Sequence, residues 1–181
     1  AWSGTSIVEA GIHQTDIMRY WSDDDVDWVR ATYTERPAEL HAAEGDNPIA
    51  YTVTYRMKKG GVANLLFTKP ARSYYNGRFD CIIWTHGTIK LEEDFVDYRF
   101  DGDWPPAEKP DMAQVRQVIS SGPHGGAMGT ENTEAISEAF ATSIIEDKPQ
   151  NRLNSFNSSI NSLASVLAAN VSNSLDGAKI V

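Results

Sequence analysis

The sequence predicts an α+β fold in which an open, mainly antiparallel β-sheet carries helices on one face. A helix-periodic segment opens the chain, strand-periodic segments follow as far as residue 100, and helix-periodic segments close it. Short turns join the strands, which favours antiparallel pairing because parallel strands need long crossover connections. Helices that stand apart from a run of strands typically gather on one face of the sheet. The length of 181 residues fits a single domain, 1–181.

The opening segment, residues 7–21, has the periodicity of a helix. Thr5 or Ser6 is a candidate N-terminal cap, and Glu9 in the first turn is favourable to the helix dipole. Three consecutive aspartates at 23–25 end the pattern. The apolar positions that define the helix are Ile7, Val8, Ile12, Ile17, Tyr20 and Trp21.

The middle of the chain has the composition and alternation of β-strands. Residues 49–58 alternate between apolar and polar side chains, which is typical of a half-buried strand with one solvent-facing side. Gly60 and Gly61 provide a tight turn into a return strand, so these two segments are expected to form a hairpin. The strands expected in this part of the chain are 26–36, 49–58, 62–68, 79–85, 88–91 and 95–100.

Two helices are expected after the strands, at residues 130–146 and 154–175. In the second of these, one apolar stripe predicts a face that packs against the domain: Ile160, Leu163, Leu167 and Val171. A short final strand is expected at residues 178–181.

Loops are expected at residues 101–110 and 120–129, where proline, acidic residues or glycine accumulate. Although 122–129 is rich in glycine, no strand precedes it, so it is not expected to be a phosphate-binding loop.

The bulk composition excludes several classes of function. Sixteen lysine and arginine residues against 25 acidic residues give a net charge of −9, which is unfavourable for binding nucleic acid. No apolar run approaches the roughly 20 residues of a membrane span, and no signal peptide is expected at the start.

Cys81, the single cysteine, lies in an apolar run and is expected to be a small buried hydrophobe. No metal-site spacing is present, and the cytoplasm is the expected compartment.

Three polar residues of the opening helix form a candidate catalytic group. Glu9, His13 and Asp16 stand at i, i+4 and i+7, which places them along one face of an α-helix. The ordinary pKa of a histidine, about 6.5, suits a general base, and a neighbouring carboxylate can orient the ring. From spacing alone, a solvated helix face remains the alternative interpretation.

The residues around this group resemble the Gfo/Idh/MocA oxidoreductase family, whose C-terminal domain begins with a G-x-H-x-x-D helix. The resemblance starts at residues 8–21, where Gly11, His13 and Asp16 match that motif. It continues through the strand, turn and return strand of 49–67 and the hairpin of 84–91. It also covers 140–149 and the ending at 176–181, so the order and spacing of several weak motifs carry the likeness.

The resemblance implies roles for particular residues. His13 falls on the catalytic histidine of the family, and Asp16 on an acid that holds substrate hydroxyls. Glu9 falls where many members have aspartate, which leaves open whether it touches substrate or only orients His13. His124, in the glycine-rich loop, is a further candidate for substrate binding. Other polar or aromatic residues that a sugar site could use are not placed by the sequence: Trp28, Tyr55, Arg72 and Trp84.

The nucleotide-binding half of such an enzyme is not found in these residues. No strand leads into a G-x-G-x-x-G turn and a helix, so NAD or NADP is expected to be bound mainly by an N-terminal Rossmann domain. The family's catalytic lysine lies in an E-K-P motif that precedes the histidine helix. Glu108-Lys109-Pro110 has the same letters but follows that helix, so we reject it as a match.

The predicted function is the substrate-binding and catalytic half of an NAD(P)-dependent oxidoreductase acting on a sugar, polyol or related secondary alcohol. The isolated chain is expected to be inactive, and a homo-oligomer through the sheet face is expected. The alternative is a non-redox small-molecule-binding or oligomerisation module of the same fold. Relatives with dehydratase-like, hydrolase-like or reductase-like chemistry form a third possibility.

Overall fold

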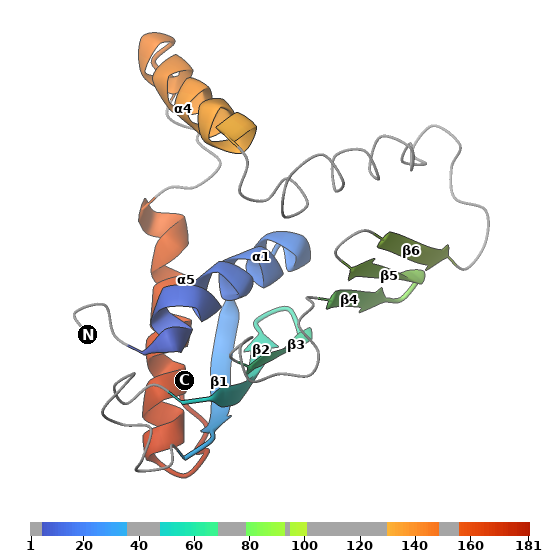
Figure 1. The fold of residues 1–181 in the computed structure, drawn as a ribbon, viewed down its shortest axis with the longest axis vertical. Helices are drawn as coiled ribbons and strands as arrows, with labels where there is room; N and C mark the ends of the chain where they lie inside the picture. The colour runs from blue at the N-terminus through green and yellow to red at the C-terminus, as the bar shows by residue number, and fades with distance from the viewer. Residues whose placement is uncertain (1–4, 36–47, 69–78, 93–94, 101–129, 149–155) are drawn as a thin grey trace. The chain divides into compact units, whose positions relative to one another are not determined.

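The structure, a computed structural model, describes residues 5–35, 48–68, 79–92, 95–100, 130–148 and 156–181 (Figure 1). The chain divides into two compact units, which we describe separately: Ala1–Tyr74 with Asn154–Val181, and Tyr75–Leu153. Both contain antiparallel sheets and helices, so the predicted α+β class is confirmed. Expected loops 101–110 and 120–129 lie outside the described residues, and the single-domain assignment of 1–181 stays a prediction.

The opening helix of the first unit has two parts. A π-helical turn, η1 (Ile7–Gly11), leads directly into the α-helix α1 (Ile12–Ser22). The predicted helix is therefore present, but its first turn is wider than an α-helical turn. The side chain of Ser6 forms no capping hydrogen bond; instead the carbonyl of Thr5 accepts from the amides of Val8 and Glu9 at 2.9 and 3.2 Å.

The helix ends where the acidic residues begin. Asp23 has a left-handed backbone conformation, with φ of 45°, and breaks the helical path. The next two residues, Asp24 and Asp25, accept hydrogen bonds from the backbone of the turn that joins the second and third strands. Asp24 accepts from the amide of Lys59 at 2.7 Å, and the backbone of Asp25 accepts from the amide of Lys58 at 2.9 Å.

Three antiparallel strands form the sheet of the first unit: β1 (Val26–Tyr33), β2 (Ala50–Met57) and β3 (Val62–Thr68), in that order. The register places Val29 opposite Tyr55 and Val53 opposite Leu65. The glycine turn is as predicted, and Gly60 uses the freedom of glycine with a φ of 104°. The expected final strand is reduced to one antiparallel bridge between Val29 and Ile180.

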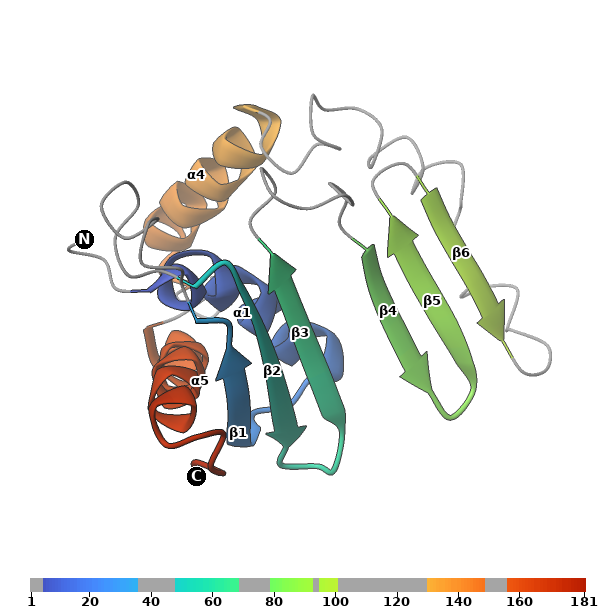
Figure 2. The ribbon, with the colours of Figure 1, turned by 60° about the horizontal axis from the view of Figure 1, so that its bottom comes forward.

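The final helix, α5 (Phe156–Ser174), packs beside β1 (Figure 2). Its predicted extent is confirmed, but the prediction of its buried face is wrong. The sheet-facing side consists mainly of small residues: Ser162, Ser165, Val166, Ala169 and Ser172. Small side chains allow the helix to approach the strand closely, which leaves the larger residues of the apolar stripe exposed.

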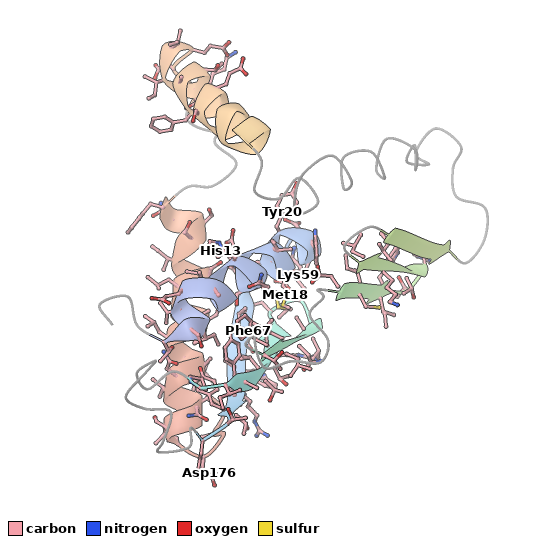
Figure 3. The ribbon with its side chains drawn as sticks, in the orientation of Figure 1. His13, Met18, Tyr20, Lys59, Phe67 and Asp176 are labelled. Atoms are coloured by element: carbon pink, nitrogen blue, oxygen red, sulfur yellow. The ribbon has the colours of Figure 1, made fainter. Side chains whose placement is uncertain are left out.

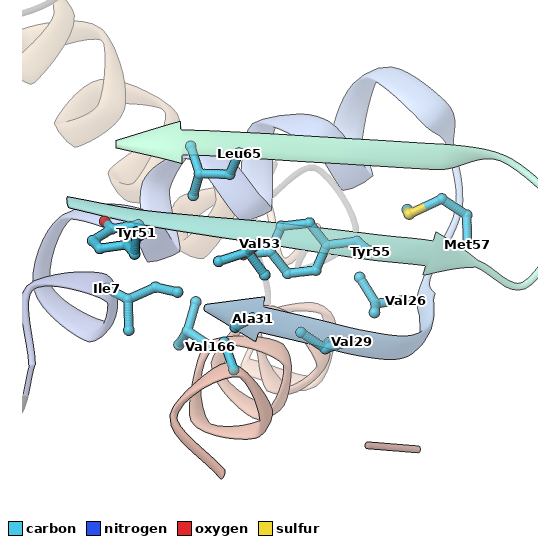
Figure 4. Close-up of a cluster of buried hydrophobic side chains, with 11 residues drawn as sticks. Ile7, Val26, Val29, Ala31, Tyr51, Val53, Tyr55, Met57, Leu65 and Val166 are labelled. Atoms are coloured by element: carbon cyan, nitrogen blue, oxygen red, sulfur yellow. The ribbon is translucent and has the colours of Figure 1, made fainter. Parts of the chain in front are cut away.

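The core lies between the three strands and the helices η1, α1 and α5 (Figure 4). Alternate residues of β2 point into it, as the alternation of 49–58 predicts. Helices therefore cover one face of this sheet, while the other face is largely exposed. The buried apolar residues are Ile7, Val26, Val29, Ala31, Tyr51, Val53, Tyr55, Met57, Leu65, Val166 and Ala169.

The second unit contains a second antiparallel sheet of three strands: β4 (Phe79–Trp84), β5 (Gly87–Glu92) and β6 (Phe95–Phe100). It also contains the helix α4 (Thr130–Ile145). All four elements match predicted segments. Cys81 is exposed, so the prediction that it is buried is wrong. It shares one side of β4 with Ile83, which is 76% exposed, and an apolar run in a strand does not bury both of its sides.

None of the helices in the described ranges has both the length and the apolar character needed to cross a membrane.

Candidate functional site

The three predicted catalytic residues lie on consecutive parts of one helix, Glu9 on η1 and His13 and Asp16 on α1. His13 (Figure 3) is exposed. Glu9 is also exposed, and Asp16 is half-buried. Glu9 belongs to the π-helical turn, whose residues are spaced differently around the axis from those of an α-helix. A π-helix has more residues per turn than an α-helix, so residues i and i+4 still lie on nearly the same side, and the grouping of the three residues into one site stays a prediction.

The imidazole of His13 makes no hydrogen bond with any described residue. The carboxylate of Asp16, one turn further on, is engaged elsewhere. Its Oδ1 atom accepts a hydrogen bond from the Ser162 hydroxyl at 2.6 Å and lies 3.3 Å from Nη1 of Arg19. The expected orientation of His13 by Asp16 is therefore not observed in this unit.

Arg19 is the centre of a polar contact between α1 and α5, and its side chain is only 12% exposed. Its Nη1 donates to the carbonyl of Ser158 at 2.6 Å and to the hydroxyl of Ser162 at 2.7 Å. Its Nη2 donates to Asp25 at 2.7 Å. One guanidinium thus ties α1 to α5 and to the start of β1, through charge-assisted hydrogen bonds that are stronger than neutral ones.

Asp25 is a further member of this network. Arg19, and to a lesser extent Lys58, hold the pKa of the Asp25 carboxyl below its ordinary value, and partial desolvation opposes them. Sequence reasoning did not single out Arg19 or Asp25. The i, i+3 spacing of Asp16 and Arg19 on one helix was the available signal.

Gly11, two residues before His13, lies close to Ile7 of the same helix and to Tyr51 of the sheet. A Cβ atom at this position would lie 2.7 Å from Cγ1 of Ile7 and 3.0 Å from the Tyr51 hydroxyl. No larger residue fits without displacing its neighbours. The hydroxyl of Tyr51 is buried and has no hydrogen-bond partner among the described residues.

Thr15, two residues after His13, fixes the same stretch of helix. Its hydroxyl donates to the carbonyl of Gly11 at 2.8 Å and lies 2.9 Å from the hydroxyl of Tyr55. Burial raises the pKa of Tyr55 to about 12, so both groups are neutral hydroxyls at ordinary pH. His13 is therefore exposed on a helix that is fastened to the sheet immediately before and after it.

The other residues considered from the sequence are dispersed. Tyr55 belongs to the core, and Trp84 is half-buried in β4. Trp28 is half-buried on β1, with the cations of Arg30 and Lys179 at 6.0 and 5.4 Å from its ring. Three further positions lie outside the described residues: Arg72, His124 and the rejected Glu108-Lys109-Pro110 segment.

Comparison with known proteins finds similarity in structure rather than in sequence. No family model matches the chain, and no curated protein matches it. Among solved structures, it is similar to an oxidoreductase from Sinorhizobium meliloti, with a TM-score of 0.70 and 17% identity. That match covers 97% of this chain and 52% of the other.

Two further matches have more specific names. The WlbA dehydrogenase from Bordetella pertussis, in complex with NADH and UDP-GlcNAcA, matches with a TM-score of 0.73 and 16% identity, over 98% of this chain and 47% of its own. The aldose–aldose oxidoreductase from Caulobacter crescentus, complexed with glycerol, matches with a TM-score of 0.65 and 11% identity, over 97% and 47%.

At these identities the comparison establishes the fold, and the chain spans about half the length of the structures that it matches. The fold implied by the Gfo/Idh/MocA resemblance is confirmed, because these oxidoreductase structures match nearly the whole of this chain. The 181 residues therefore have the fold of one half of a Gfo/Idh/MocA-type oxidoreductase chain.

Proposed function

We propose that this chain is the substrate-binding and catalytic half of an NAD(P)-dependent oxidoreductase that acts on a sugar, polyol or related secondary alcohol. The observation that supports this function best is the setting of His13. The imidazole is exposed and makes no hydrogen bond to a described residue, yet Gly11 and Thr15 hold its helix firmly against the sheet. A rigid backbone with an accessible base is a favourable starting point for acid–base catalysis.

An exposed His13 is also what the alternative interpretation, a solvated helix face, predicts. In the proposed full-length enzyme, an N-terminal Rossmann domain of the same protein would cover this surface and complete a cleft. Among the described residues, no strand leads directly through a glycine-rich turn into a helix, which is the arrangement of a Rossmann-type dinucleotide-binding site. NAD or NADP would be held mainly by the N-terminal half, and its nicotinamide would supply hydride transfer.

Within this chain, His13 would accept the hydroxyl proton of the alcohol as the carbonyl forms. Asp16 would bind a neighbouring substrate hydroxyl. Its Oδ1 is held by Ser162 and Arg19, and its Oδ2 has no hydrogen bond to a described residue. Glu9 would contribute a second carboxylate one turn earlier, and His124 a contact from the glycine-rich segment.

The decisive experiment is a His13→Ala variant of the full-length protein. We expect the rate of substrate oxidation to fall by about 10²- to 10⁴-fold, the usual contribution of a general base, while nicotinamide binding is unchanged. His86→Ala is the matched control, because His86 is an exposed histidine in the β4–β5 turn. Unchanged turnover in His13→Ala would remove His13 from the mechanism. We expect the isolated 181 residues to be inactive and to bind the cofactor weakly or not at all.

A homo-oligomer through the sheet is a further part of the proposal. The side of the β1–β3 sheet opposite the helices carries exposed residues, including Leu66, which is 70% exposed. This uncovered face also favours the second candidate function, a non-redox binding or oligomerisation module. Redox turnover by the full-length protein would exclude that alternative.

A further inference from the structure

The strand β1 stands at one end of the three-stranded sheet of the first unit, so one side of its backbone faces away from β2. We call this side the β1 edge. Unpaired N–H and C=O groups along such an edge can pair with a strand of another molecule, which extends the sheet across two chains. In this structure four amides of the β1 edge already donate hydrogen bonds, and their acceptors all come from the C-terminal part of the chain.

Asn161 of α5 pairs with the start of β1 in the manner of a strand residue. Its Oδ1 accepts a hydrogen bond from the amide of Val26 at 2.9 Å, and its Nδ2 donates to the carbonyl of the same residue at 3.1 Å. Residues that face each other in an antiparallel ladder exchange the same two kinds of bond. One amide side chain therefore takes the place of a neighbouring strand at this point.

Two further side chains of α5 bind the other end of β1. The Ser172 hydroxyl accepts from the amide of Ala31 at 2.9 Å, and Oδ1 of Asn173 accepts from the amide of Tyr33 at 2.8 Å. Ten of the nineteen residues of α5 are serine or asparagine, which is unusual for a helix because these side chains tend to bond to nearby backbone groups. The contacts with the β1 edge explain part of that composition.

The chain that follows α5 occupies the middle of the β1 edge. Gly177, with a φ of 77°, turns the backbone so that Ile180 comes to lie beside Val29. These two residues exchange N–H···O bonds of 2.9 and 3.0 Å. The Ser172 hydroxyl also donates to the carbonyl of Ala178 at 2.6 Å, which fastens this segment to the end of the helix.

The dimensions of a helix and a strand explain how α5, which lies beside β1 (Figure 2), reaches both ends of it. Asn161 and Ser172 are 11 residues apart. That separation is about three turns of α-helix, so both side chains lie on the same side of α5, about 16 Å apart. Their partners Val26 and Ala31 are five residues apart, which is also about 16 Å along a strand. The helix and the strand therefore run in the same direction with matched spacing.

We propose that α5 and the segment 178–181 form an edge cap: they occupy, within the chain, the site at which a strand of another molecule would pair with β1. All of these contacts lie within the first compact unit. The protein therefore does not associate through the β1 edge while the edge cap is in place. This inference does not depend on the proposed reaction, and it is compatible with association through a face of the sheet.

The first test is hydrogen exchange, measured by NMR for individual amides of the 181-residue chain. In the double variant Asn161→Ala/Asn173→Ala, we expect the amides of Val26 and Tyr33 to exchange about tenfold faster than in the wild type, because each loses its acceptor. Unchanged exchange at both amides would overturn the proposal.

Two controls make this result specific to the β1 edge. The amides of Arg30 and Thr32 point toward β2, because successive amides of a strand alternate in direction, and they should exchange as in the wild type. Asn157→Ala is the matched variant, since it makes the same change at an exposed asparagine of α5 that has no hydrogen bond to a described residue. If exchange at Arg30 and Thr32 also rises, the sheet itself is lost, and the single variant Asn173→Ala then decides the question at Tyr33.

The second test is self-association, measured by sedimentation velocity over a range of concentrations. We expect Asn161→Ala/Asn173→Ala to form larger species than the wild type at the same concentration, because an opened strand edge can pair with that of another copy. Asn157→Ala should behave like the wild type. Faster exchange at the β1 edge without larger species would also overturn the proposal, because the edge cap would then not be what keeps other strands away.

Discussion

The hydroxyl of Thr15 in α1 lies 2.9 Å from the hydroxyl of Tyr55 in β2, and both groups are buried. This contact joins the helix that carries His13 to the central strand of the sheet beneath it. Tyr51, four residues earlier on the same face of β2, points its hydroxyl toward the same helix but finds no partner among the described residues. The two tyrosines therefore form a natural pair for comparison.

Removing the Tyr55 hydroxyl is expected to destabilise the protein more than removing that of Tyr51. Tyr55→Phe loses a buried hydrogen bond, so we expect the free energy of unfolding to fall by about 1 kcal/mol. Tyr51→Phe removes a buried hydroxyl without a partner, and we expect no loss or a small gain. Urea unfolding of both variants measures the difference. Equal losses would mean that the Tyr51 hydroxyl has a stabilising partner.

Gly11→Ala is expected to destabilise the junction of η1 and α1. The new methyl group would lie 2.7 Å from Ile7 and 3.0 Å from Tyr51, so at least the Ile7 side chain must shift to accommodate it. We expect a loss of about 1 to 3 kcal/mol, as for other overpacked sites. Gly61→Ala is the control, because its Cβ would meet Met57 at an ordinary 3.4 Å. A stable Gly11→Ala protein would show that the helix adjusts at little cost.

Ser162→Ala is expected to loosen the contact between α1 and α5. Ser162 is buried, donates to Asp16 at 2.6 Å and accepts from Arg19 at 2.7 Å, so its removal leaves two charged groups with fewer partners. We expect a loss of about 1 to 3 kcal/mol in the free energy of unfolding. Ser174→Ala is the control, since the only hydrogen bond of that exposed serine to a described residue is with the Val171 carbonyl of its own helix turn. Thermal unfolding of both variants checks the difference.

Lowering the pH is expected to reduce the stability that this network contributes, because the Asp25 carboxylate becomes protonated. Its folded pKa lies below the ordinary value of 3.8, chiefly because of Arg19. The stability that it contributes is therefore present above the unfolded pKa and is lost as pH falls through the folded value. The effect is modest because the side chain is 41% exposed and water screens it. Urea unfolding between pH 6 and pH 3 should show a smaller loss for Asp25→Asn than for the wild type. An identical pH dependence would contradict this assignment.

The strands were predictable because their signals are local. The alternation of 49–58 and the glycine pair after it place β2, the turn and β3 within a few residues of their observed bounds. The same local rules gave wrong predictions for the buried side of α5 and for the burial of Cys81. Hydrophobicity alone does not reveal which side of a helix or strand faces the core, and α5 buries its small residues where it meets β1.

The candidate site was predictable only in part. The sequence placed His13 and Asp16 on the opening helix, and the structure places them there. It did not reveal that Asp16 faces Arg19 and Ser162, because Ser162 is 146 residues away along the chain. The π-helical turn at the start of the opening helix also has no recognisable local signal.

The sequence by itself determined the α+β class, the extent of most helices and strands, and the place of His13 on the first helix, because periodicity and turn chemistry act over a few residues. Only the tertiary structure decided which helix side is buried, how closely Gly11 approaches Tyr51, and which partner Asp16 holds. Those features depend on contacts between residues that are far apart in the chain, and close packing in the folded protein determines which contacts form.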